Sequence, residues 1–194
     1  MRLYLFPLMG VFLTCLLAGQ ARADNVADGS VSFTGTLLGE ETCTLVNPDI
    51  NVDFGTFSVD PGATPEILTS RDIAFHFTKC PTTIHRVLMH INFDEVSGSF
   101  SSAPYGIGNQ GSAGVMGTLA CNAGEISQAG VFGCPSAPAV LRGGYLLTGI
   151  VHNDRTLFFP LTVSLVAQRK GITGLPSVAP GTINMIVNLT FEEM

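Results

Sequence analysis

The sequence predicts an all-β protein, folded as an antiparallel β-sandwich in one domain, and three observations support this prediction. Apolar and polar residues alternate with a period of two in several short segments, which is the pattern of half-buried strands. Turn residues such as Asp60-Pro61-Gly62 separate these segments. No segment of useful length shows the helical period, and only 12% of the residues are charged. Several short strands joined by turns favour a sandwich over a helical or mixed fold.

The first 23 residues have the features of a signal peptide. Arg2 precedes an apolar run over residues 5–17, and Ala21-Arg22-Ala23 supplies the small-x-small pattern of a cleavage site. A membrane anchor is the alternative, but the run is shorter than the roughly 20 residues that cross a bilayer. We therefore expect residues 1–23 to be removed on export.

The chain that remains from Asp24 is acidic. It loses Arg2 and Arg22 and retains 7 basic against 15 acidic residues, a net charge of −8. Such a charge argues against nucleic acid or an anionic lipid surface as a partner. Its length of about 170 residues suits one domain with a proper core.

Four cysteines remain after processing: Cys43, Cys80, Cys121 and Cys134. An even number in an exported chain indicates two disulfides, because the compartment is oxidising. Of the three possible connectivities we favour Cys43–Cys80 with Cys121–Cys134, since each pair lies in a distinct part of the chain.

Taken in order, the first predicted strand covers residues 24–35. Ala27, Gly29, Val31 and Phe33 fall on one side, and the polar residues Asp28, Ser30, Ser32 and Thr34 alternate with them. Further strands are predicted over residues 50–55, 71–80, 87–93, 145–151 and 157–168. Residues 97–144, rich in Gly, Ser, Ala and Pro, are expected to be short strands and long surface loops, one of them closed by Cys121 and Cys134.

The last strand has the clearest alternation in the chain. Gly181 opens it, and its polar side carries Thr182, Asn184, Asn188 and Thr190, with only Ile186 breaking the pattern. Its apolar side carries Ile183, Met185, Val187, Leu189 and Phe191. Such a strand buries one face and can pair with a neighbour along both edges.

Three features of the chain together resemble the chaperone-usher pilin family of type 1 and P-type fimbriae. The first is Gly29-Ser30-Val31-Ser32-Phe33-Thr34-Gly35 followed by Cys43-Thr44-Leu45. The second is Ile73-Ala74-Phe75-His76-Phe77-Thr78-Lys79-Cys80-Pro81, followed by residues 87–93 and Gly98. The third is Gly181, fourteenth from the end, opening the closing alternating strand.

The resemblance implies an incomplete immunoglobulin-like sandwich, residues 36–194, behind an N-terminal donor-strand extension, residues 24–35. A periplasmic chaperone would lend the missing strand, and at the outer-membrane usher a neighbouring pilin subunit would replace it. Donor residues would be Ala27, Gly29, Val31 and Phe33. Gly181 and the five apolar residues of the last strand would form the groove that binds the chaperone. The expected location is an extracellular fimbrium, reached through the periplasm and supporting cell adhesion.

The chain departs from the family pattern in two places. Pilins usually have an aromatic residue next to last, whereas here Phe191 is followed by Glu192-Glu193-Met194. The Cys121/Cys134 pair is additional to the commonest major subunits. Both departures favour a minor or specialised subunit.

Other functional classes have weaker support. No Gly-x-Ser-x-Gly elbow, carboxylate pair or phosphate loop is visible, so we expect no catalytic site, cofactor or small-molecule substrate. His76, Cys80, His85 and His90 match no metal-ligand spacing, and no metal is expected. The main alternative is a secreted carbohydrate- or receptor-binding β-sandwich module, although sugar sites often use exposed aromatics and Trp is absent. A free-standing secreted sandwich is a third possibility.

Overall fold

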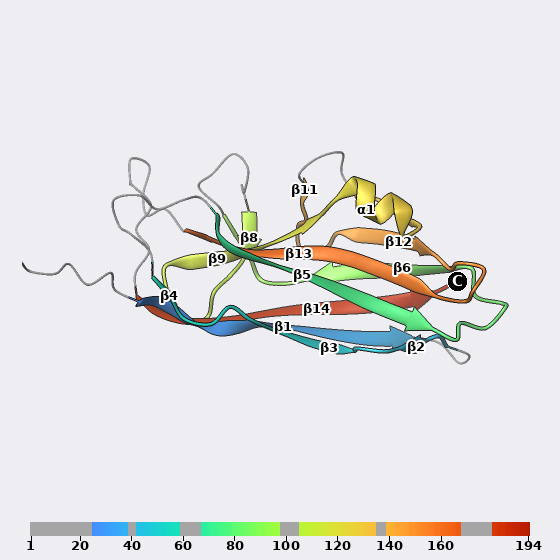
Figure 1. Ribbon diagram of the computed structural model, residues 1–194, viewed down its shortest axis with the longest axis horizontal. Coiled ribbons are helices and arrows are strands. Elements are labelled where there is room, and N and C mark those ends of the chain that lie inside the picture. Colours follow the sequence, from blue (N-terminus) through green and yellow to red (C-terminus); the bar gives the residue numbers. More distant parts are fainter. Residues whose placement is uncertain (1–24, 39–41, 59–66, 98–104, 135–138, 168–179) are drawn as a thin grey trace, which may run out of the picture.

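The computed structural model describes residues 25–38, 42–58, 67–97, 105–134, 139–167 and 180–194. In this part of the chain two mainly antiparallel β-sheets enclose one core, so the protein is all-β (Figure 1). The expected signal peptide, residues 1–23, lies outside the described residues.

Each sheet has seven strands. The first sheet has, in spatial order, β10 (Val131–Phe132), β12 (Leu146–Ile150), β6 (Arg86–Asn92), β14 (Gly181–Glu193), β1 (Asn25–Leu38) and β3 (Asp49–Asp53), with β4 (Phe57–Ser58) also paired to β1. The second has β2 (Thr44–Leu45), β5 (Ile67–Thr78), β13 (Leu157–Ala167), β9 (Val115–Cys121), β8 (Tyr105–Ile107) and β7 (Glu95–Ser97), with β11 (Ala139–Val140) also paired to β9. Among these pairings only β1 with β14 is parallel.

Aromatic rings from both sheets meet in the core. The ring of Phe191 on β14 lies 4.9 Å from that of Phe77 and 5.6 Å from that of Phe75, both on β5, measured between centroids. The Phe159 ring on β13 lies 5.9 Å from the Phe191 ring. These separations are those of tilted and edge-to-face aromatic pairs, which add to the stability that burial provides. Phe191 therefore joins the first sheet to the centre of the second.

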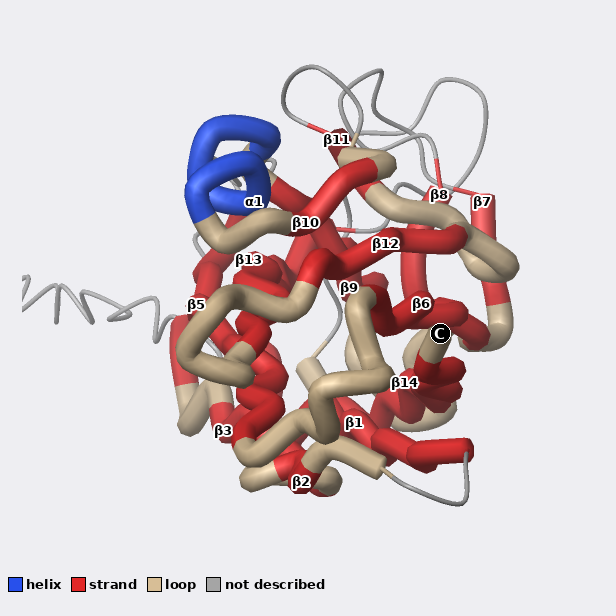
Figure 2. Tube along the Cα trace, turned by 90° about the vertical axis from the view of Figure 1, so that its right-hand side faces the viewer, coloured by secondary structure: helices blue, strands red, loops and turns tan. Residues whose placement is uncertain are grey.

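Strands appear where alternation predicts them, and the largest difference lies within residues 97–144. There β9 is a central strand of the second sheet, and almost all of its residues are buried. A strand covered on both faces has no reason to alternate, so this pattern could not reveal it. The same region contains the six-residue helix α1 (Ala123–Gln128), which lies beside β10 (Figure 2). Six residues are too few to show a helical period, so the sequence pattern gives no sign of this helix.

The structure joins Cys43 to Cys80 and Cys121 to Cys134, the pairing that the sequence favours. The second disulfide closes the segment that holds α1 and β10. Two disulfides are typical of a protein exported to an oxidising compartment. Among the described residues, no helix has both the length and the apolar character to span a bilayer.

Candidate functional site

The last strand, β14, buries one face and exposes the other, as its alternation predicts. The five apolar residues expected to line a groove all face the core with at most 4% of their surface exposed: Ile183, Met185, Val187, Leu189 and Phe191. The alternate residues Asn184, Ile186 and Asn188 point to solvent. Gly181, at the start of the strand, lies against Ser112 and the backbone nitrogen of Ala113, and a Cβ there would collide with both.

β1 lies alongside β14 from Ala27, opposite Gly181, to Leu38, opposite Glu192. Val31 and Phe33 point into the core and are 0% and 1% exposed. Gly29 lies opposite Ile183, where a Cβ would collide with the Ile183 carbonyl oxygen and lie 2.8 Å from its carbonyl carbon. The glycine therefore permits the close approach of the two backbones.

The edge of β1 that faces away from β14 pairs with two further strands of the same chain. Residues 30–34 are antiparallel to β3, and Ala27 lies opposite Phe57 of β4. β1 thus occupies the space between β3 and β14 (Figure 1). Without residues 25–35 this space would be an apolar groove flanked by unpaired backbone groups, which is unfavourable in water.

The structure brings the expected donor residues and the expected groove residues together, but within one molecule. The resemblance implies a neighbour's groove for residues 24–35, and the sequence shows no obvious hairpin partner for them in the same chain. In the structure β1 continues without a break across residue 35, the expected boundary between extension and domain. Alternation predicts that both strands bury one face, and it carries no information on which strands are neighbours.

The opposite edge of β14 is covered in two parts. β6 pairs with its second half, from Asn188 to Glu193. A loop over residues 109–113 covers the first half, where the Gln110 and Ala113 backbone N–H groups donate to the carbonyls of Asn184 and Thr182 at 2.9 and 3.1 Å. The Asn109 side chain completes this loop, because its Oδ1 accepts the Asn184 N–H at 2.8 Å.

Hydrogen bonds also hold the C-terminal residues, at which the chain departs from the pilin pattern, to the rest of the domain. Backbone hydrogen bonds of 2.8 and 2.9 Å join Met194 to Arg86. The Oε1 of Glu193 accepts the Cys43 N–H at 2.7 Å, while its Oε2 is buried with no partner among the described residues. Burial raises the pKa of the Glu193 carboxyl, and the hydrogen bond from Cys43 opposes this in part. No feature of the sequence indicated this contact.

The histidines considered as metal ligands do not converge. His76 stacks on Phe158 with 4.0 Å between ring centroids, His90 contacts Glu192 at 3.5 Å, and Cys80 is in a disulfide. Within the described ranges no group of three or more His, Cys, Asp or Glu residues has the arrangement of a metal site.

Comparisons with known proteins assign no family to the chain. A scan against protein-family models and a search of curated proteins both return no match. The geometry of β1 and β14 is therefore the main basis for inferring function.

Proposed function

We propose that this chain is a structural subunit of a chaperone-usher surface fibre that polymerises by donor-strand exchange. The supporting observation is the placement of residues 25–35, which lie next to the expected cleavage site. They fill the space between β3 and β14 and bury Val31 and Phe33. In this proposal the same segment fills either its own groove or that of the next subunit.

Strand exchange is chemically reasonable here because β1 supplies two separable kinds of interaction. Its main chain pairs with β3 and β14, which gives affinity with little regard to sequence. Its buried residues at alternate positions, together with Gly29, set the register. After the expected cleavage, β1 can also leave its place without any loop being threaded. The remaining residues 36–38 keep their pairing with residues 190–192.

The intramolecular strand has an advantage over any free competitor, because tethering gives it an effective concentration in the millimolar range. An exchange mechanism therefore needs a partner that occupies the groove before β1 does. A periplasmic chaperone that lends a strand would have this role, and an outer-membrane usher would be the place where the next subunit replaces it. With donor and groove on one molecule, successive subunits join head to tail in an open filament. The filled sandwich is, in this proposal, immunoglobulin-like.

Peptide capture tests the proposal. A fluorescent peptide of residues 24–35 would be mixed with the chain 24–194 and with a chain that starts at Thr36, and binding followed by fluorescence anisotropy. We expect the shorter chain to bind the peptide and to gain a cooperative unfolding transition at higher temperature, because the peptide binds only the folded state. The chain 24–194 should capture it slowly, or only when refolded in its presence.

A peptide with Val31→Asp and Phe33→Asp is the matched control. It retains the length and the backbone, but would bury two charges, and it should not bind. If the shorter chain captures neither peptide, or both equally, residues 24–35 do not act as an exchangeable strand and the proposal fails.

A further inference from the structure

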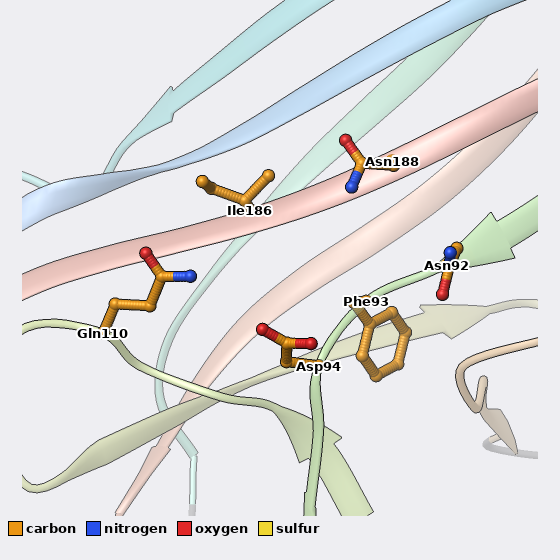
Figure 3. Close-up of a pocket in the computed structure, with 6 residues that line it drawn as sticks. All are labelled: Asn92, Phe93, Asp94, Gln110, Ile186 and Asn188. Atoms are coloured by element: carbon orange, nitrogen blue, oxygen red, sulfur yellow. The ribbon is translucent and has the colours of Figure 1, made fainter.

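A polar pocket of about 180 Å³ lies on the outer face of the first sheet, where β6 stops pairing with β14 (Figure 3). Its lining comes from the end of β6, the segment that follows, the loop over residues 109–113, and β14. The lining residues are Asn92, Phe93, Asp94, Gln110, Ile186 and Asn188.

The pocket exists because two different neighbours share one edge of β14. β6 reaches Asn188, and the 109–113 loop reaches Asn184, which leaves Ile186 between them. Asp94 is the residue that would continue the β6 pairing opposite Ile186. Its carbonyl instead accepts the Gly108 N–H at 2.8 Å.

The main chain of Ile186 consequently faces the gap. Even-numbered residues of β14 direct their N–H and C=O groups to this edge, as the bonds of Thr182, Asn184 and Met194 show. Because these directions alternate along a strand, the N–H and C=O groups of Ile186 also point to this edge. Within the described residues no partner lies opposite it on this edge, so one backbone donor and one acceptor are available to a ligand.

Four polar side chains surround these groups. Asn92 and Asn188 are directly opposite each other, and Gln110 and Asp94 point toward one another in Figure 3. All four residues are exposed, and in the described part of the chain none of their side chains hydrogen-bonds to another protein group. Ile186, 42% exposed, adds an apolar wall.

This set of groups fits closely spaced hydroxyls. Each amide offers a donor and an acceptor, the carboxylate accepts, and a hydroxyl can do both. Anions are disfavoured by Asp94 and by the net charge of the mature chain, and a hard cation such as Ca²⁺ would find only one carboxylate. The volume is below the roughly 300–1,000 Å³ of sites for drug-sized ligands. We propose that the pocket binds one neutral sugar ring, with its hydroxyls on the polar groups and its C–H face against Ile186.

The test is a titration of the isotope-labelled chain 24–194 with methyl glycosides of mannose, galactose and glucose, followed by NMR. Because the site is open to water, we expect a dissociation constant in the millimolar range. Saturable shifts should appear at the amides of Ile186 and Asn188 for at least one glycoside. The assay uses the monomer and does not require strand exchange, so its result is independent of the proposed fibre function.

Substitutions make the test specific. Asn188→Ala and Asp94→Ala should each weaken binding about 5- to 10-fold or more, since each removes a hydrogen-bonding group. Asn153→Ala, in the exposed turn between β12 and β13, is the matched control and should bind as the wild type does. Asp94→Asn should newly admit a methyl glucuronide, which the wild type is expected to reject.

Three outcomes would overturn the inference. The first is the absence of saturable shifts with all three glycosides up to roughly 100 mM. The second is equal binding by the Asn188→Ala and wild-type chains. The third is that Ca²⁺ alone saturates the same amides, which would make the pocket a cation site.

Discussion

At Gly29 the backbones of β1 and β14 approach so closely that only a hydrogen fits between them. Glycine usually weakens a strand, because it gives up more conformational entropy than other residues when it folds. Here that cost is offset by the pairing that a side chain would prevent. The residue thus reports directly on whether β1 lies in this register.

Replacing Gly29 with Ala should destabilise the chain 24–194 by roughly 1–3 kcal/mol, the usual cost of inserting an atom where there is no space. Denaturant unfolding measures the change, and Ser30→Ala is the neighbouring control, since it removes an atom from a half-buried side chain and inserts none. If Gly29→Ala unfolds at the wild-type midpoint, β1 and β14 are not paired in this register.

Glu193 provides a second prediction at the scale of one residue. Its pKa is raised by burial, so the folded protein binds its proton more tightly than the unfolded chain does. Stability from this group is therefore fully present below the ordinary glutamate pKa of about 4.3 and is lost as pH rises through the higher folded value. Glu193→Gln retains an acceptor for the Cys43 N–H and should remove this fall.

The measurement is the free energy of unfolding from acid to neutral pH, compared between the wild type and Glu193→Gln. The neighbouring Glu192→Gln is the control, because the Glu192 side chain is exposed. We expect the Glu193→Gln chain to be the more stable of the two at neutral pH. A wild-type pH profile that Glu193→Gln leaves unchanged would contradict the assignment.

At the scale of elements, the first half of β14 depends on a loop where the second half has a true strand. The Asn109 side chain connects the two, because its Oδ1 also accepts the Gly111 N–H and its Nδ2 donates to the carbonyls of Ala113 and Thr182. One amide therefore holds the loop in shape and attaches it to the strand. The start of β14 should be more easily opened than its end.

Asn109→Ala should lower the stability by roughly 1–3 kcal/mol, because backbone groups of the strand lose partners. Hydrogen exchange should speed up at the amides of Thr182 and Asn184, while those of Thr190 and Glu192, paired with β6, remain protected. Gln110→Ala, next in the loop, removes a side chain without such bonds and should leave exchange unchanged. Uniform acceleration along β14 would show that the loop has no separate role.

Alternation of apolar and polar residues detects a strand only when one of its faces is buried and the other is exposed. It located β5, β6, β13 and β14, since each has one face in the core and one toward solvent for much of its length. It did not reveal β9, which is covered on both faces. It also could not show that β1 pairs with β14 of its own chain, or that Glu193 reaches Cys43, because both depend on contacts distant in sequence.

At the scale of the whole molecule, the central question is whether β1 remains in place. Its pairing with β3 allows a direct test. Ser32 lies opposite Asn51, and the bond from the Phe54 N–H to the Gly29 carbonyl indicates that odd-numbered β1 residues carry the hydrogen bonds to β3. Ser32 and Asn51 are therefore a non-hydrogen-bonded pair, with a Cα separation of about 4.5 Å that a disulfide can span.

Replacing both Ser32 and Asn51 with Cys should lock β1 into its own groove. The oxidised chain should be more stable by about 3 kcal/mol, because the new bond closes a loop in the unfolded state. It should also fail to capture the fluorescent peptide of residues 24–35, even after refolding with the bridge intact, since the groove has no vacancy. The chains with only one of the two cysteines, its single free thiol alkylated and the native disulfides intact, are the controls and should capture the peptide as the wild type does. Capture by the locked chain would place the peptide elsewhere on the molecule, and strand exchange through the β3–β14 groove would then be excluded even though the protein folds.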